Sequence, residues 1–145
     1  MIRRPLSRLL PLVRGAALTL AAGLALTLPR AGQAQSLPID QIKLPPGFTI
    51  ELLARVPNAR QMALSPANIL YVGSMREGKV HALPLDVDFK PGKLYVVADR
   101  LKMPVGVAWR DSSLYVSAVD RILRLDDIDR RLENPPAPAI VRADL

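Results

Sequence analysis

The tripeptide Leu70-Tyr71-Val72 occurs a second time as Leu114-Tyr115-Val116, 44 residues further along the chain. Each copy follows a short turn-forming run, Pro66-Ala67-Asn68 in the first case and Asp111-Ser112-Ser113 in the second. An apolar run that returns at a fixed period of roughly 40 to 50 residues is typical of repeat architectures. The sequence therefore predicts two copies of one structural unit.

Other positions keep nearly the same spacing. Residues 96–101 resemble residues 140–145 at an offset of 44, and Ala63 matches Ala108 at an offset of 45. The third apolar run of each unit is offset by 42, because the hairpin Val119-Asp120 is two residues shorter than its counterpart. The repeat therefore extends over the whole unit.

Each unit divides into four short apolar runs separated by turn residues, which indicates four β-strands. Four antiparallel strands in about 40–50 residues make the blade of a β-propeller, so we predict an all-β chain of propeller blades. A compact two-sheet sandwich is the alternative. The predicted strands are residues 61–65, 69–74, 79–83 and 93–99 in the first unit, and 105–110, 114–118, 121–125 and 139–143 in the second.

A further strand is predicted ahead of the first unit. Phe48, Ile50 and Leu52 alternate with polar residues, which is the pattern of a half-buried strand. Propellers commonly close their ring with an N-terminal strand, and we assign this role to the segment. The predicted organisation is a leader to the first strand over 35–47, a closing strand over 48–56, blade one over 57–101 and blade two over 102–145.

Two blades are too few for a ring, since closed propellers have at least about four. We therefore expect the chain to be a fragment, or a prematurely ended reading frame, of a longer propeller. A chain without any folded state is a weaker alternative.

The first 34 residues have the features of an export signal. They contain five arginines and no acidic residue, followed by an uncharged apolar run over 15–28, and Gly32 and Ala34 suit cleavage before Gln35. An uncleaved membrane anchor is the alternative, but 14 residues of helix span only about 21 Å, less than a bilayer core. We expect cleavage, a periplasmic or secreted protein, and membrane contact only during export.

The charge of the remaining chain excludes a nucleic-acid footprint. The whole sequence has 20 basic and 13 acidic residues, a net charge of +7, but without the leader only 15 basic residues face the same 13 acids. The absence of cysteine excludes disulfides, thiol catalysis and cysteine-bound zinc. No nucleophile-elbow motif is present, which disfavours a hydrolase.

Several segments resemble one family. These are residues 42–50, 58–66 and 103–108, among which Leu44-Pro45-Pro46-Gly47-Phe48 and Met103-Pro104-Val105-Gly106-Val107-Ala108 are the most specific. Together with the two Leu-Tyr-Val runs they resemble the N-terminal part of the sorbosone dehydrogenase group, which are secreted quinoproteins related to soluble glucose dehydrogenase. The resemblance covers essentially all of residues 42–145.

The resemblance implies a six-bladed propeller that oxidises a sugar or sugar aldehyde with pyrroloquinoline quinone (PQQ) and Ca²⁺ and passes electrons to a respiratory acceptor. It also implies that the catalytic histidine and most quinone contacts lie beyond Leu145. We therefore expect no catalytic residue and no metal ligand in this chain, and neither bound cofactor nor activity. A non-catalytic exported propeller that binds a protein or glycan is the alternative function.

Three side chains are candidate cofactor contacts. Arg60 precedes the first innermost strand, where propeller ligands bind, and its guanidinium suits a carboxylate of the tricarboxylate quinone. Arg76 is a second candidate cation, and Gln61 could donate a hydrogen bond to a quinone oxygen. Solvated surface positions are the alternative for all three.

The remaining polar residues are expected to be structural. His81, the only histidine, is predicted to lie on the surface of the third strand, and Asp86 and Asp88 to lie in a solvated loop and not in a calcium site. The charged segment 126–132 is predicted to be a solvated loop with self-neutralising charges. Phe48 and Trp109 are predicted to pack in the core or between blades.

Overall fold

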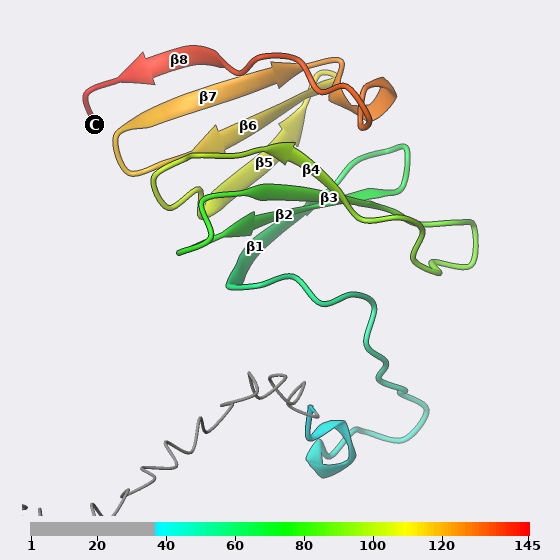
Figure 1. Ribbon diagram of the computed structural model, residues 1–145. Coiled ribbons are helices and arrows are strands. Elements are labelled where there is room, and N and C mark those ends of the chain that lie inside the picture. Colours follow the sequence, from blue (N-terminus) through cyan, green and yellow to red (C-terminus); the bar gives the residue numbers. More distant parts are fainter. Residues whose placement is uncertain (1–36) are drawn as a thin grey trace, which may run out of the picture. The chain divides into compact units, whose positions relative to one another are not determined.

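Residues 37–145 are described by a computed structural model, in which two four-stranded antiparallel sheets carry the fold (Figure 1). The first sheet has the strand order β1-β2-β3-β4 and the second has the order β5-β6-β7-β8, so both are simple meanders. The strands are β1 (Ala59–Leu64), β2 (Ile69–Ser74), β3 (Val80–Pro84), β4 (Tyr95–Ala98), β5 (Gly106–Arg110), β6 (Ser113–Ser117), β7 (Arg121–Asp126) and β8 (Ala139–Ala143), with 3-10 turns η1 (Ile39–Gln41) and η2 (Ile128–Arg130).

The all-β prediction is confirmed, and each of the four strands predicted in either unit has a counterpart. β2 and β8 have the predicted bounds, while β1 begins two residues before its predicted start because Ala59 pairs with Ser74 across a bulge. The described part of the chain contains no α-helix. The two sheets do not close into a ring.

The pairing register repeats between the sheets. Tyr71 lies between Ala63 and Ala82 in the first sheet, and Tyr115 lies between Ala108 and Arg124 in the second. Each third strand also has a register shift at the equivalent place, between Val80 and His81 in β3 and between Ile122 and Leu123 in β7. The internal repeat of the sequence is therefore a repeat of hydrogen-bonding register.

The core lies between the two sheets. The first sheet contributes one face, which we name the packed face, consisting of Ala63, Tyr71, Val80, Ala82 and Ala98. The second sheet covers it with side chains that are almost fully buried, namely Val107, Leu114, Val116, Leu123 and Leu125. The opposite side of the second sheet, which we name the outer face, consists of Ala108, Tyr115, Ile122, Arg124 and Arg142.

The two sheets lie closest at their first strands. β1 contacts β5, and a side chain added at Gly73 in β2 would place its Cβ 2.5 Å from the carbonyl oxygens of both Pro104 and Val105. Only glycine permits that approach. At the other end a cleft of about 680 Å³ separates the sheets, with residues 96–101 of β4 and its exit on one wall and Ile140 of β8 on the other. The sheets therefore diverge from their first strands to their fourth.

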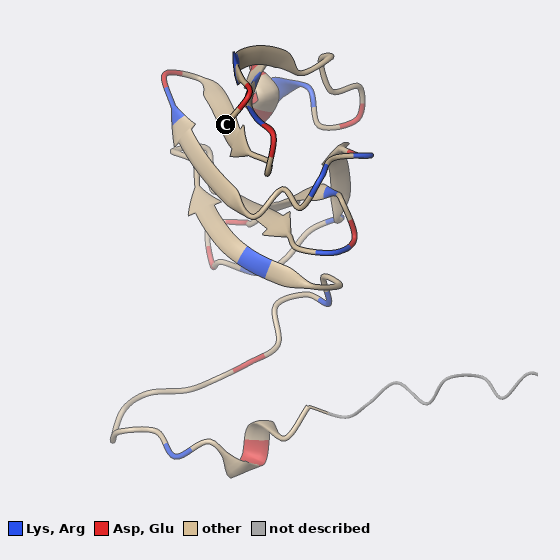
Figure 2. Cartoon of the chain, turned by 90° about the vertical axis from the view of Figure 1, so that its left-hand side faces the viewer, with Lys and Arg blue, Asp and Glu red and all other residues tan. Residues whose placement is uncertain are grey.

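The turns follow their sequence chemistry. Asn68 adopts φ 56°, and its amide donates to the Ser65 carbonyl oxygen at 3.1 Å. Asparagine tolerates this left-handed backbone, which confirms the expected turn at Pro66-Ala67-Asn68. In the connection from β3 to β4, Asp86 Oδ1 accepts hydrogen bonds from the amides of Asp88 and Lys90, so the Asp86 side chain closes this loop. Most Lys, Arg, Asp and Glu residues lie in turns and at strand ends, although a basic residue also lies within a strand (Figure 2).

The segment 48–56, predicted as a closing strand, forms no strand and pairs with neither sheet, and its part in closing a ring stays a prediction. Phe48 is 68% exposed, so its assignment to a core is wrong. A strand needs a partner edge, and the predicted partner was a different, later blade. The predicted export signal over 1–34 lies outside the described residues. Within residues 37–145 no helix is long and apolar enough to cross a membrane.

Candidate functional site

Two of the three candidate residues lie on the strand that approaches the neighbouring sheet. Arg60 and Gln61 occupy the bulge of β1, where the register with β2 shifts between Ala59 and Met62. Both residues are exposed. A Cβ added at Gly106, the first residue of β5, would lie 3.5 Å from Gln61 Oε1, so the amide of Gln61 lies against the inner strand of the second sheet.

Arg76 lies in the hairpin between β2 and β3, and a backbone hydrogen bond joins this hairpin to the start of β1. The amide of Met75 donates to the Asn58 carbonyl oxygen at 3.0 Å. Arg76 therefore leaves the hairpin next to the segment that leads into Arg60, and its side chain is exposed. The structure brings the two arginine-bearing segments to the same end of the first sheet.

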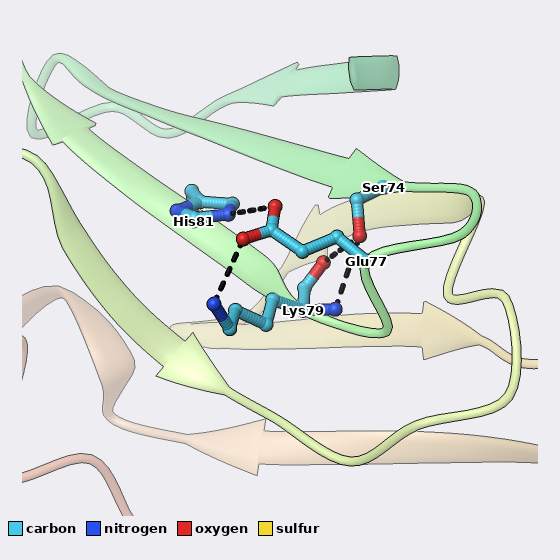
Figure 3. A network of polar contacts seen from close by, with 4 residues as sticks. All are labelled: Ser74, Glu77, Lys79 and His81. Carbon is cyan, nitrogen blue, oxygen red and sulfur yellow. Dashed lines mark hydrogen bonds and ion pairs between the residues drawn. The ribbon is translucent and has the colours of Figure 1, made fainter. Parts of the chain in front are cut away.

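Polar contacts hold the hairpin in shape around Arg76 (Figure 3). Ser74 Oγ donates to the Lys79 carbonyl oxygen at 2.7 Å and accepts the Lys79 amide at 3.0 Å. The carboxylate of Glu77 then reaches two side chains, Lys79 Nζ at 2.8 Å and His81 Nε2 at 3.1 Å. Because these contacts tie both ends of the hairpin together, the loop that carries Arg76 has a defined conformation.

The basic side chains of this hairpin lower the pKa of the Glu77 carboxyl. The ammonium of Lys79 first, and then the ring of His81, hold the pKa of the Glu77 carboxyl below its ordinary value through hydrogen bonds. Glu77 is thus occupied by Lys79 and His81. Neither Arg60 nor Arg76 forms an ion pair with another described residue, so both guanidinium groups can bind an anion.

The fit of the implied cofactors can be judged from these residues. Two unpaired guanidiniums and one amide suit the carboxylates and a quinone oxygen of PQQ. They supply no wall against the ring system, because all three side chains are exposed. For Ca²⁺, residues 37–145 hold no group of three or more Asp, Glu, His or Cys side chains that could bind a metal ion. The three candidate residues therefore suit the carboxylates and one oxygen of PQQ, but they do not enclose its ring system.

His81 is placed differently from the prediction. The side chain was expected on the surface, but the residue is only 4% exposed, and Nδ1 has no partner among the described residues. The repeat explains its burial: His81 pairs with Val72 as Leu123 pairs with Val116. His81 therefore occupies a position at which the second sheet has a buried leucine.

The sequence did not predict the polar contact that joins the two sheets. Asp129 in η2 accepts hydrogen bonds from Tyr71 Oη at 2.6 Å and from Trp109 Nε1 at 3.1 Å. Ile128 beside it is fully buried. The prediction of a solvated, self-neutralising loop over 126–132 is therefore wrong at these two residues. Asp126 forms its ion pair with Arg124 and accepts a hydrogen bond from Ser113.

The contact also changes the acidity of Tyr71. Burial first, and then the hydrogen bond to Asp129, raise the pKa of the Tyr71 hydroxyl well above its ordinary value. Trp109 packs against the core, which confirms the predicted core position, and its indole is the second donor to the same carboxylate. Tyr71, Trp109 and Asp129 thus form one polar anchor between the sheets.

Comparisons of the chain with protein-family models, with curated proteins and with solved structures gave no match.

Proposed function

We propose that the chain forms the first two blades of an exported β-propeller quinoprotein that oxidises a sugar or sugar aldehyde with PQQ. The observation that carries the proposal is the position of the segments that resemble this family. Residues 58–66 contain β1, and residues 103–108 lead into β5, so both occupy the equivalent first strand of a repeated unit.

The arrangement of the two sheets supports the propeller part of the proposal. Each sheet is a four-stranded antiparallel meander, and the two diverge from contact at β1 and β5 to a cleft between β4 and β8. Blades that surround a central channel have the same divergence, because their first strands line the axis and their fourth strands lie at the rim.

The residues at the inner end of the sheets have a defined part in this proposal. Bound PQQ would supply an electrophilic quinone as the hydride acceptor. Arg60 and Arg76 would bind its carboxylates, because guanidinium groups match carboxylates in charge and geometry. Gln61 would donate a hydrogen bond to an oxygen of the ring. The hairpin contacts of Ser74 and Glu77 fix the loop from which Arg76 extends.

The proton acceptor is not assigned to this chain. His81 is its only histidine, and the side chain is buried in β3 against Glu77. The proposal therefore requires a histidine in a part of the polypeptide encoded beyond codon 145. Sequencing the DNA past that codon tests this requirement, and a frame without a histidine-containing third unit contradicts the proposal.

Titration of PQQ into the longer polypeptide tests the cofactor. Absorbance should show binding, and Arg60→Gln should weaken it at least about tenfold, since a hydrogen bond to a charged group contributes roughly 1.5–3 kcal/mol. Arg110→Gln is the matched control, because Arg110 is an exposed arginine of β5 that pairs with Asp111. An absence of binding would favour the non-catalytic exported module. Sugar oxidation by the 145-residue chain with added PQQ would contradict its role as a part.

A further inference from the structure

The outer face of the second sheet is the repeat-equivalent of a surface that is buried elsewhere in the same chain. Tyr115 and Ile122 occupy the register positions of Tyr71 and Val80. Tyr71 and Val80 are fully buried, whereas Tyr115 and Ile122 are only half-buried. Ala63 packs against the core while its equivalent Ala108 is exposed.

The chain itself shows what covers such a face. The packed face of the first sheet is covered by the second sheet through four fully or nearly fully buried apolar side chains: Leu114, Val116, Leu123 and Leu125. The connection from β7 to β8 of the same sheet contains η2, whose Asp129 accepts the hydroxyl hydrogen of Tyr71. The covering element is therefore a four-stranded unit of this repeat, with an apolar face and a carboxylate.

The outer face retains the groups that this contact uses. Tyr115 carries the same phenol at the same register position as Tyr71. Its cross-strand partner Arg124 has a guanidinium that can only donate hydrogen bonds, so the hydroxyl hydrogen of Tyr115 stays available for an acceptor.

We propose that the outer face of the second sheet docks a third four-stranded unit of the same repeat, carried by the same polypeptide, whose carboxylate accepts the Tyr115 hydroxyl hydrogen. The proposal rests on the propeller part of the proposed function and is independent of the quinone. It identifies Tyr115 as the equivalent of the Tyr71 anchor.

Two positions determine how the third unit fits. Ser117 is the equivalent of Gly73, which receives the carbonyl oxygens of Pro104 and Val105. We expect the Ser117 hydroxyl to donate to an equivalent carbonyl oxygen of the third unit. Arg124 stands where the first sheet has Ala82, and its ion pair with Asp126 draws the guanidinium toward the rim of the sheet.

A tandem extension tests the docking without any cofactor. Residues 102–145 are repeated once after Leu145 of the full chain, so that the added unit offers the apolar face and the aspartate that cover the first sheet. We expect β6 and β7 of the original unit to gain amide protection in hydrogen exchange, by tenfold or more for each 1.4 kcal/mol of docking free energy. A second extension carrying Arg124→Ala in the original unit restores the alanine of the first sheet and removes the bulkiest side chain.

The decisive measurement compares Tyr115→Phe in the natural and extended chains. The substitution should leave the melting temperature of the natural chain unchanged and lower that of the extended chain by roughly 2–4 °C, the shift expected for about 1 kcal/mol in a chain of this size. Replacing the added unit's equivalent of Asp129 by alanine should remove the effect of Tyr115→Phe, as expected for a coupled pair.

Two results would overturn the proposal. One is an unchanged outer face in both extended chains, with β6 and β7 exchanging as in the natural chain. The other is association of the natural chain into dimers that Tyr115→Phe weakens, which would assign the face to a second copy. Neither result depends on PQQ, so a failure of the quinone titration and a failure of docking are distinguishable.

Discussion

The two sheets of this protein have the same strand order and nearly the same register, yet the first sheet has buried side chains on both faces, whereas the outer face of the second sheet is partly exposed. The first sheet is covered on its packed face, where Tyr71 is fully buried, while the equivalent Tyr115 on the outer face of the second sheet is half exposed. Sequence similarity at a position therefore does not fix its burial. What fixes it is whether the next unit of the repeat lies against that face.

The largest expected effect separates the two tyrosines. Tyr71→Phe removes a hydrogen bond to a carboxylate at the boundary between the sheets and should lower the free energy of unfolding by roughly 1.5–3 kcal/mol. Tyr115→Phe should change it by less than about 0.5 kcal/mol, as surface substitutions usually do. Urea denaturation of both variants measures the difference, and equal losses would contradict the comparison.

The glycine of β2 gives the next contrast. Gly73→Ala would place a Cβ 2.5 Å from two carbonyl oxygens, so the sheets must move apart at their closest approach. We expect a loss of about 1–3 kcal/mol, the usual cost of overpacking. Its equivalent Ser117 is exposed, and Ser117→Ala should be nearly neutral. Thermal unfolding followed by circular dichroism compares the two, and a neutral Gly73→Ala would be inconsistent with the close approach.

Alkaline unfolding should report the Tyr71 anchor. Because the folded state raises the pKa of this hydroxyl above the unfolded value of about 10, its contribution is complete below that pH and is lost as the pH rises further. Each unit of pH above 10 then costs up to about 1.4 kcal/mol. Denaturation curves between pH 8 and 11 test this, with Tyr71→Phe expected to have the shallower dependence.

The smallest effect is expected from a substitution that makes the first sheet more like the second. His81→Leu introduces the residue found at Leu123 and removes the buried Nδ1 that lacks a partner. It also removes the contact with Glu77, so the two changes offset each other and the melting temperature should stay constant or rise slightly. A clear fall would show that the Glu77 contact outweighs the unpaired nitrogen.

The sequence predicted those parts of the fold that depend on local pattern. Alternating apolar runs and turn residues located all eight strands, and the offset of 42 in the third strand matches the pairing of Tyr71 with Ala82 and of Tyr115 with Arg124. The same offset aligns His81 with Leu123, so the repeat contained the signal for its burial. The surface assignment considered the residue type and not this alignment.

The local sequence pattern did not predict the contacts between segments that are distant in the chain. Asp129 lies in a run of mostly charged residues, and its role as acceptor for Tyr71 and Trp109 depends on the way the second sheet covers the first. The segment 48–56 has the pattern of a strand but lacks a paired edge. For the candidate site, the sequence predicted Arg60 and Gln61 near the first inner strand. It did not predict the hydrogen bond from the Met75 amide to the Asn58 carbonyl oxygen, which brings the Arg76 hairpin beside them.

The exposure of β8 has a consequence for handling the protein. All five residues of this strand are exposed, including Ile140 at 60% and Val141 at 50%, and its outer backbone edge is not paired within either sheet. An exposed apolar pair such as Ile140-Val141 on an unpaired edge favours intermolecular strand addition, while Pro138 before the strand and Arg142 within it oppose this addition. Concentrated solutions should therefore nucleate aggregates at this edge, and a single lysine at the Val141 position should delay them.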